Sequence, residues 1–252
     1  MQGNEKDEKL IVSRALDAVY SADKNYQVKH IGFLTPFQRG IILKNVFASQ
    51  DVKTVFDGGY PNAERVMFVA HPEYLDFNID DIISVIKVSG RDLNGLTHRD
   101  YLGSLMGLGI TRENIGDILV DDEGAFIFVK AEISDYIMQN LDKIGRRGIN
   151  KELIDCSEAV IPEPRTKEIS GTVASERIDA FLAFSTGLSR AKVCEIIEKD
   201  LVSLNFEIVS SVSAKVSEGD LISVRGYGRI RVKKIGGLTR KGRISVKADK
   251  FE

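Results

Sequence analysis

Two of the five prolines in the chain stand at alternate positions, in the segment Ile161-Pro162-Glu163-Pro164-Arg165-Thr166. Proline has no backbone N–H and pushes the residue before it out of the helical region. The segment therefore disfavours both a helix and a central strand. We predict a linker over residues 159–170, which divides the 252 residues into a longer N-terminal part and a C-terminal domain over residues 171–252.

The two parts carry opposite net charge. Residues 171–252 contain 15 Lys and Arg against 10 Asp and Glu, a net charge of +5. Residues 1–170 contain 20 basic and 27 acidic residues, a net charge of −7, so the overall charge of −2 averages two unlike parts. Such an asymmetry predicts that the C-terminal domain binds a polyanion.

The basic residues concentrate near the end of the chain. Ten Lys and Arg and a single acid, Asp249, lie between Arg225 and Lys250. Within this run, Arg229-Ile230-Arg231-Val232-Lys233 alternates basic and apolar residues, which predicts a strand with its cations on one face. The alternative is a solvated basic tail. We favour the strand, because an ordered segment loses less entropy on binding a phosphate backbone.

The first 76 residues predict a small α/β region. Apolar residues recur at helical spacing over residues 7–22, and Thr35-Pro36 predicts the N-cap and first residue of a helix that runs to about Ala48. Strands are predicted over residues 52–56 and 65–71, with a turn between them.

Residues 77–158 predict the order βαββαβ, with strands over 82–88, 117–121, 125–129 and 151–156 and helices over 97–108 and 133–144. This is the order of the ferredoxin-like or RRM-like fold, so the expected class for the whole chain is α+β. Phe126 and Phe128 would share one face of the third strand, where RNA-recognition domains place aromatic rings that stack on bases. We favour core packing for both rings, because apolar residues on a half-covered sheet usually pack.

The C-terminal domain predicts a short helix over residues 176–184, a turn at Gly187 and a second helix over 190–199. Ser189 is a natural N-cap for the second helix. A free Ser hydroxyl, exposed amides and the cations Arg190 and Lys192 would together favour a phosphate group. The alternative is that these two cations pair with Glu195 or Glu198.

This combination resembles the αL RNA-binding module that is named for small-subunit ribosomal protein S-four. The matching residues are Arg177-Ile178-Asp179, Phe181-Leu182, Gly187, Ser189-Arg190-Ala191-Lys192, Ile197, Val202, Leu204-Asn205, Lys215-Val216, Gly219-Asp220, Ile222 and Val224. The resemblance implies an RNA-contacting side lined by Arg177, Ser189, Arg190, Lys192 and Lys215. We expect Arg229, Arg231, Lys241 and Arg243 to add phosphate contacts from the basic run, so that helices and strands clamp the backbone. The chain departs from the usual module at Asp200 and Phe206, where glycine is common.

Further motifs occur along nearly the whole chain, namely Gly58-Gly59-Tyr60, Ala63-Glu64-Arg65, the segments 96–103, 108–110 and 115–120, Gly226-Tyr227-Gly228-Arg229 and Thr239-Arg240-Lys241-Gly242-Arg243. In these motifs the chain resembles YlmH-type proteins. The resemblance implies an N-terminal α/β region, a ferredoxin-like central domain and a C-terminal αL domain. It also implies that the protein is encoded near bacterial cell-division genes. It further implies binding to the large ribosomal subunit and to peptidyl-tRNA during rescue of stalled nascent chains.

Signatures of catalysis and cofactor binding are missing from the sequence. It contains no GxxxxGK[ST], no GxGxxG after a strand and no HExxH, and Cys156 and Cys194 form no CxxC pair. We therefore expect no catalytic residue, cofactor or metal. No run of about 18 apolar residues occurs and the charged N-terminus lacks the apolar core of a signal peptide, so we expect no membrane span and a cytoplasmic location with reduced thiols.

The sequence thus predicts a non-enzymatic RNA-binding protein that acts on ribosomal RNA or ribosome-bound tRNA of the large subunit. Two alternatives remain open. One is an RNA-modifying enzyme with an active site in residues 1–156 and an αL domain for targeting. The other is an adaptor whose acidic part docks a protein while its basic part docks RNA.

Overall fold

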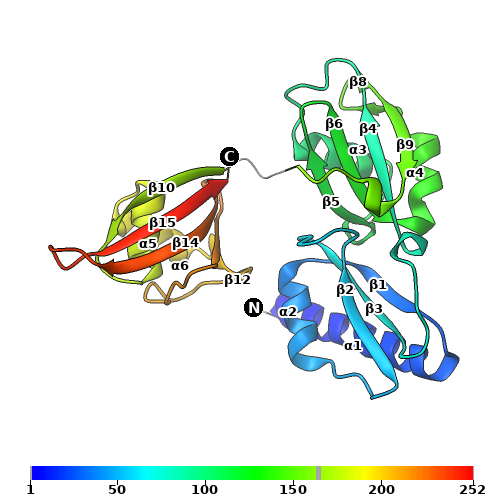
Figure 1. Cartoon of the computed structure of the whole chain (residues 1–252), viewed down its shortest axis with the longest axis horizontal. Helices are drawn as coiled ribbons and strands as arrows, with labels where there is room; N and C mark the ends of the chain where they lie inside the picture. Colours follow the sequence, from blue (N-terminus) through cyan, green and yellow to red (C-terminus); the bar gives the residue numbers. More distant parts are fainter. Residues whose placement is uncertain (1, 163–165, 252) are drawn as a thin grey trace. The chain divides into compact units, whose positions relative to one another are not determined.

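The computed structural model describes residues 2–162 and 166–251 and has an α+β fold. It divides into two compact units, of which the first ends at Pro162 (Figure 1). Within the described ranges, no helix is both long and apolar enough to cross a membrane.

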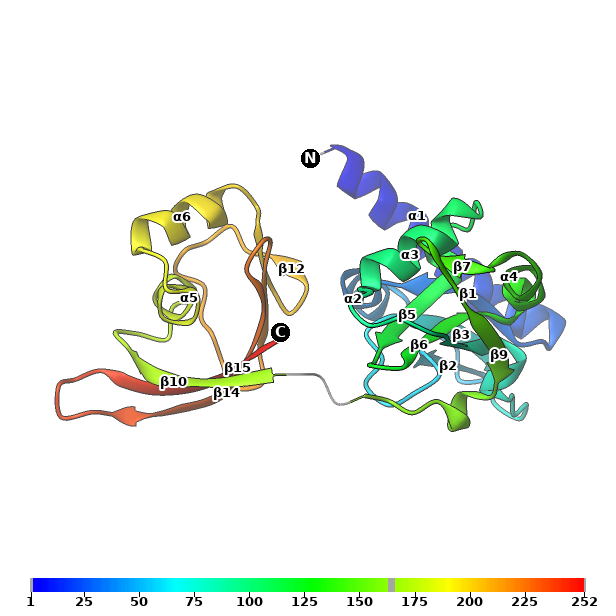
Figure 2. The same ribbon diagram turned by 90° about the horizontal axis from the view of Figure 1, so that it is seen from above.

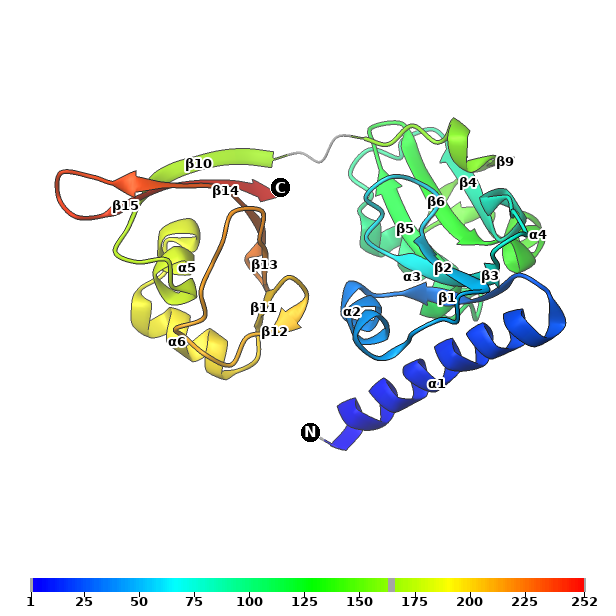
Figure 3. The same ribbon diagram turned by 60° about the horizontal axis from the view of Figure 1, so that its bottom comes forward.

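The first unit begins with a sheet covered by two helices. The strands β1 (Lys29–Leu34), β3 (Val66–Pro72) and β2 (Val52–Asp57) form an antiparallel sheet in that order. Helices α1 (Gln2–Asn25) and α2 (Pro36–Asn45) pack on one face of it (Figure 3). Thr35 caps α2 as predicted, in a reciprocal box with Gln38. The helix ends three residues earlier than expected, and β1 was not predicted.

The central segment has the order β4 (Ile83–Ser89), α3 (His98–Gly107), β5 (Ile115–Val120), β6 (Gly124–Lys130), α4 (Ser134–Asn140) and β9 (Asn150–Ile154). Its antiparallel sheet runs β5-β6-β4-β9, with α3 and α4 on one face. The helix predicted to reach Ile144 ends at Asn140. A hairpin of β7 (Lys143–Ile144) and β8 (Arg147–Gly148) follows and returns Ile144 to the same core, so the apolar spacing continues although the helix does not.

The other face of the central sheet packs against the N-terminal sheet. Phe126 and Phe128 of β6 are buried in a cluster with Phe33 of β1 and with Met67 and Val69 of β3. The prediction that these two rings pack in the core is confirmed. The face on which RNA-recognition domains stack bases is therefore covered here, and the regions predicted separately before and after residue 76 share this buried cluster.

A polar network crosses the same interface. Asp117 of β5 accepts hydrogen bonds from the Tyr60 hydroxyl and from the backbone N–H of Glu64, both at 2.7 Å. The buried Arg65 guanidinium donates to the carbonyl oxygens of Phe33 (2.8 Å), Arg112 (3.0 Å) and Ile115 (2.9 Å). Burial, aided by the Arg112 charge, lowers the pKa of Arg65 to about 10, so the group remains charged at neutral pH.

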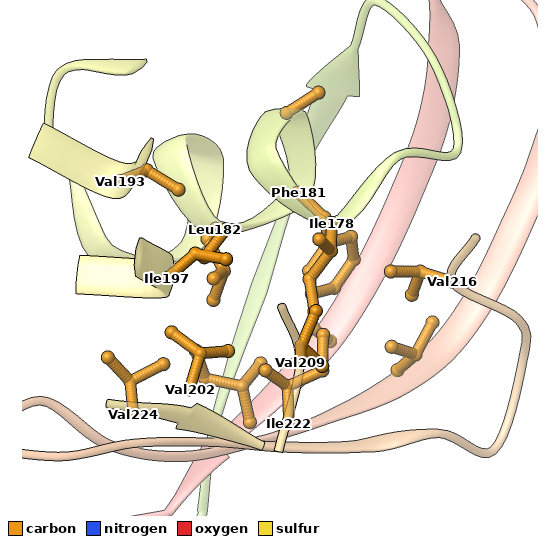
Figure 4. Packing of buried hydrophobic residues seen from close by; sticks show 14 of the residues in the cluster. Ile178, Phe181, Leu182, Val193, Ile197, Val202, Val209, Val216, Ile222 and Val224 are labelled. Carbon is orange, nitrogen blue, oxygen red and sulfur yellow. The ribbon is translucent and has the colours of Figure 1, made fainter. Parts of the chain in front are cut away.

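The second unit is a curved antiparallel sheet with two helices on one side. The sheet order is β10 (Thr166–Val173), β15 (Ile244–Phe251), β14 (Gly228–Leu238), β13 (Leu221–Val224), β11 (Val202–Leu204) and β12 (Glu207–Ile208). Helices α5 (Ile178–Thr186) and α6 (Arg190–Glu198) lie on the same side of β10, β15 and β14 (Figure 2). Their buried residues Phe181, Leu182, Val193 and Ile197 meet the sheet in a single core (Figure 4).

Residues 166–170, predicted as part of the linker, form the first half of β10 instead. The whole strand pairs with β15 from Thr166–Phe251 to Val173–Ile244. This strand lies at the edge of the sheet and alternates a few core-facing residues, such as Ile169 and Val173, with exposed polar ones. Its low apolar content explains why the pattern does not predict a strand.

Candidate nucleic-acid interface

The starts of the two C-terminal helices are set by local sequence. Arg177 is the N-cap of α5, and Gly187 ends this helix in the left-handed conformation with φ of 74°. Ser189 then caps α6, as predicted. Because only three residues separate the helices, the chain turns sharply and the first turn of α6 returns toward the first turn of α5.

Asp179 joins these two helix starts. Its carboxylate accepts hydrogen bonds from Nε and Nη2 of Arg177, at 3.1 and 3.2 Å, and from Nη2 of Arg190, at 2.6 Å. The backbone N–H of Ala180 adds a fourth bond at 2.8 Å. Burial alone would raise the pKa of Asp179, but the bonds from Arg190 and Arg177 outweigh it, so the pKa is lowered and the carboxylate stays charged.

The Asp179 side chain is buried, whereas its two arginine partners are exposed. The side chain of Asp179 is 4% exposed, whereas those of Arg177 and Arg190 are 44% and 58% exposed. A guanidinium carries five N–H donors, and Asp179 uses two from Arg177 and one from Arg190. Both groups therefore keep donors for an external acceptor, held in place by an internal one.

Lys215 lies beside this pair of arginines. Its backbone forms an isolated β-bridge with Arg177, and its side chain, which is 75% exposed, pairs with Glu176 at 3.1 Å. Arg177, Arg190 and Lys215 thus gather at one end of the helix pair. We call these three residues, with Asp179 beneath them, the arginine cluster.

The other two residues predicted on α6 have local partners. The Ser189 hydroxyl is not free, since its oxygen accepts the backbone N–H of Lys192 at 3.3 Å. The Lys192 ammonium pairs with Glu195 at 2.8 Å, which is the alternative weighed for it, while Arg190 pairs with Asp179 instead. Hydrogen bonds from Lys192 and Lys199 lower the pKa of Glu195 to about 2.

The predicted basic strand exists, but it faces away from the helices. Ile230 and Val232 of β14 are buried in the core beneath α5 and α6, while Arg229 and Arg231 are exposed on the opposite side of the sheet. The Arg231 guanidinium lies over the Phe251 ring, 5.6 Å from its centroid. Arg229 and Arg231 therefore do not share a surface with the arginine cluster, which corrects the expectation of a clamp between helices and strands.

The remaining two candidates belong to the end of the β14–β15 hairpin. Arg243 holds the neighbouring strand β10, since Nε donates to Oγ1 of Thr172 at 2.9 Å and Nη2 donates to its carbonyl at 2.8 Å. Lys241 is exposed in the connecting turn. In the adjoining strands, Glu168 forms ion pairs with Lys233 at 3.1 Å and with Lys247 at 3.4 Å.

The two departures from the αL pattern lie in left-handed backbone. Asp200 follows α6 with φ of 56°, and Asn205 and Phe206 have φ of 47° and 71° in the two-residue turn between β11 and β12. A turn with positive φ at both central residues is of the kind that prefers Asn-Gly. Asp200 and Phe206 thus occupy backbone conformations that favour glycine, which the αL module commonly has at these two positions.

Asp179 belongs to the Arg-Ile-Asp triplet of the αL pattern, but it is not among the predicted site residues. The signal that could have identified it is an acid two residues after an arginine at a helix start, on the apolar side of that helix. Among residues 2–162 and 166–251, no group of three or more His, Cys, Asp or Glu side chains could hold a metal ion.

Two family models match the first unit. One is described as "YlmH, N-terminal" and matches residues 7–74, and the other is described as "Putative RNA-binding domain in YlmH" and matches residues 72–158. A relative from Bacillus subtilis (strain 168), named "Ribosome-associated protein quality control protein P2", is 34% identical over 238 residues. The match covers 94% of this chain and 92% of the relative.

The chain belongs to the YlmH family. A solved structure, "Cell division protein ylmH from Streptococcus pneumoniae", is 24% identical, with a TM-score of 0.49. That similarity covers 61% of this YlmH-family chain and 94% of the other. The arginine cluster lies outside both matched family segments.

Proposed function

We propose that this YlmH-family chain is a non-enzymatic protein that binds structured RNA, either ribosomal RNA or ribosome-bound tRNA, through a C-terminal αL-type module. One observation carries the proposal, namely the buried carboxylate of Asp179 that holds the exposed guanidinium groups of Arg177 and Arg190 side by side. The central domain, with its βαββαβ order, would be a ferredoxin-like domain that supports this binding.

The arginine cluster suits a phosphate backbone for physical reasons. Planar guanidinium groups donate paired hydrogen bonds to phosphate oxygens, and a fixed orientation reduces the entropy lost on binding. RNA duplexes are recognised largely by shape and by backbone contacts, which needs no base-reading groove. The name of the Bacillus subtilis relative supports a place on the ribosome, so we propose a role in the cytoplasm in rescue of stalled large-subunit complexes.

The test is binding to purified bacterial large ribosomal subunits over a series of salt concentrations. The variant Arg177→Gln/Arg190→Gln should bind more weakly, and its plot of log affinity against log salt should flatten by about 0.7 to 0.9 per lost phosphate contact. The control Arg14→Gln/Lys53→Gln removes two cations from surface ion pairs of the first unit and should leave both quantities unchanged. Equal affinity and slope for all three proteins would contradict the proposal.

The non-enzymatic part has its own test. RNA incubated with the protein should show no new modified nucleoside by mass spectrometry. A modified nucleoside that appears only when the protein is present would contradict this part of the proposal and would favour an RNA-modifying enzyme.

A further inference from the structure

The end of the β14–β15 hairpin carries cations that do not belong to the arginine cluster. Strand β14 ends at Leu238 and β15 begins at Ile244, and the connection between them projects beyond α5 and α6 in every view of the second unit (Figure 1, Figure 2 and Figure 3). We call residues 236–243 the hairpin head. This segment contains Arg240, Lys241 and Arg243 but no acid and no aromatic residue.

Hydrogen bonds within the head fix its backbone. The N–H of Gly242 donates to the carbonyl of Thr239 at 2.9 Å, and the N–H of Thr239 donates to the carbonyl of Arg243 at 2.7 Å. The left-handed conformation of Gly242, with φ of 69°, closes the turn. Arg240 and Lys241 are the two central residues of this turn. Their positions are therefore set before any ligand binds, which reduces the entropy lost on binding.

A bulge separates the head from the rest of the hairpin. The register of β14 and β15 shifts between Ile235 and Leu238, so that Gly236 and Gly237 together face the single residue Ser245. A Cβ on Gly236 would collide with the Ser245 hydroxyl, so no larger residue fits there. Bulges bend a strand and change the direction of the residues beyond it. The head is thus aimed independently of the sheet that carries it.

The head and the arginine cluster lie at the same end of the second unit. Nε and Nη2 of Arg243 donate to Oγ1 and the carbonyl of Thr172 in β10, at 2.9 and 2.8 Å. β10 then leads into α5, whose N-cap Arg177 is five residues further along the chain. Five residues span at most about 18 Å. Unlike Arg229 and Arg231, the head is therefore within reach of a ligand that the arginine cluster holds.

The acids around the head are engaged elsewhere. No Asp or Glu occurs between Leu221 and Ala248. The acids of the adjoining strands and turns have partners, namely Glu168 with Lys233 and Lys247, Glu176 with Lys215, Asp220 with Asn205, Asp249 with Lys233, and Glu218 with the N–H of Ile235. Arg240 and Lys241 are exposed, and neither has an ion pair or hydrogen bond with another residue that the structure describes. Such cations favour a polyanion.

An exposed leucine indicates which form of RNA fits the head. Leu238 is 74% exposed, although Ile230 and Val232 of the same strand are buried. Proteins that enter a minor groove commonly combine cations with an apolar side chain. The minor groove of an RNA duplex is wide and shallow and displays the riboses. Single strands are instead bound on aromatic rings, which the head lacks.

We propose that the hairpin head enters the minor groove of an RNA duplex while the arginine cluster holds the phosphate backbone of the same duplex. In this arrangement Arg240 and Lys241 contact phosphates at the border of the groove and Leu238 packs against riboses. The inference rests on the proposed function, because it assumes that the ligand of the chain is RNA. It narrows that ligand to a double-stranded region.

The first test is Arg240→Gln/Lys241→Gln in the full chain, with bacterial large ribosomal subunits as the probe. We expect weaker binding and a salt slope reduced by about 1.4 to 1.8, for two lost contacts at about 0.7 to 0.9 each. The charge-matched control is Lys233→Gln/Lys247→Gln, which removes two cations of the same hairpin that already pair with Glu168. If the two double variants bind alike, the inference is overturned.

Leu238→Ser tests insertion separately from charge. Binding to large subunits should weaken while the salt slope stays unchanged, because no phosphate contact is lost. The matched control is Ile208→Ser, which replaces another exposed aliphatic residue of the same unit, in β12. Thermal unfolding should show that both variants remain folded. Equal affinity of the two variants would contradict entry of the head into a groove.

A perfect RNA duplex and one of its separated strands test the form of the ligand. The unaltered chain should bind the duplex more tightly than the strand, and Arg240→Gln/Lys241→Gln should lose most of that difference. Equal affinity of the unaltered chain for both forms would overturn the assignment to a duplex.

Further comparisons separate this inference from the proposed function. Weaker subunit binding by Arg177→Gln/Arg190→Gln, with unchanged binding by Arg240→Gln/Lys241→Gln, would overturn the role of the head and leave the proposed function standing. An absence of salt-dependent subunit binding by the unaltered chain would overturn the proposed function itself. If Arg240→Gln/Lys241→Gln lost binding to phosphatidylglycerol vesicles but kept subunit binding, the head would belong to a membrane surface and the inference would be wrong.

Discussion

Nη2 of Arg190 lies 2.6 Å from Oδ2 of Asp179, a contact that joins the first turns of α5 and α6. The variant Asp179→Asn keeps the size of the side chain but removes the charge that holds both Arg177 and Arg190. We expect a loss of about 1 to 3 kcal/mol in the free energy of unfolding of the C-terminal unit, because the amide is a poorer acceptor and brings donors into a buried site. Binding to large subunits should weaken as well, although the substitution removes no cation. Chemical denaturation and subunit binding check the two effects.

The same carboxylate predicts a pH dependence with a definite sign. The folded-state pKa of Asp179 is lowered, so its contribution to stability is fully present above the unfolded-state pKa, near 4, and is lost as pH falls through the folded value. The difference in unfolding free energy between the unaltered chain and Asp179→Asn should stay constant from pH 7 to 5 and shrink below about pH 4. If the difference already shrinks between pH 7 and 5, the pH dependence comes from another titrating group and the prediction is contradicted.

Phe206 occupies a left-handed position that favours glycine. Phe206→Gly should therefore raise the free energy of unfolding by about 1 kcal/mol, since relief of backbone strain exceeds the loss of a half-buried ring. Phe206→Ala is the matched control, because it removes the ring but keeps a Cβ at positive φ. Thermal unfolding of the two variants checks the prediction, and equal stability would show that the backbone at this turn carries no strain.

Phe128 lies in the interface between the two sheets of the first unit, so its role is packing. Phe128→Ala should cost about 3 to 5 kcal/mol of unfolding free energy, and Phe128→Leu less than about 1.5 kcal/mol. Because Phe128→Leu keeps the fold, its affinity for large subunits should equal that of the unaltered chain. If Phe128→Leu lost affinity for large subunits at unchanged stability, the result would contradict a packing role and favour base stacking by the Phe128 ring.

Arg65 donates hydrogen bonds to the carbonyl oxygens of Phe33 in β1 and of Arg112 and Ile115 in the central segment. Arg65→Met removes these donors and should destabilise the first unit by about 3 kcal/mol or more, because buried carbonyls would lose their partners. The comparison is Arg14→Met, which breaks the exposed pair of Arg14 with Glu113 and should cost less than about 1 kcal/mol. Denaturant midpoints measured on the full chain distinguish the two.

Features that depend on neighbouring residues could be predicted from the sequence. Thr35 and Ser189 cap the starts of helices and Gly187 ends one, each through contacts within a few residues, and all three act as expected. The strands β1 and β10 could not be predicted, because each is stabilised by a partner far away in the chain. β1 pairs with β3 and β10 pairs with β15, and neither has a strong apolar alternation of its own.

The candidate site shows the same limit. The alternation around Arg229 and Arg231 correctly predicts that Ile230 and Val232 lie on the opposite face from the arginines, and that face is the buried one. It does not reveal which side of the sheet the helices cover, because that depends on how the whole unit closes. The meeting of Arg177 and Arg190 at Asp179 likewise requires the turn between α5 and α6, which brings Arg190 to Asp179, 11 positions earlier in the chain.

The core shared by β3 and β6 has a consequence for dissection of the chain. The two family segments meet near residue 74, yet Met67, Val69, Val85 and Phe128 pack across that boundary. A fragment that stops there would leave an apolar sheet face in water on each side of the cut, and such faces aggregate. Residues 2–162 should therefore melt in a single cooperative transition, and the shortest soluble N-terminal fragment should extend to about Pro162.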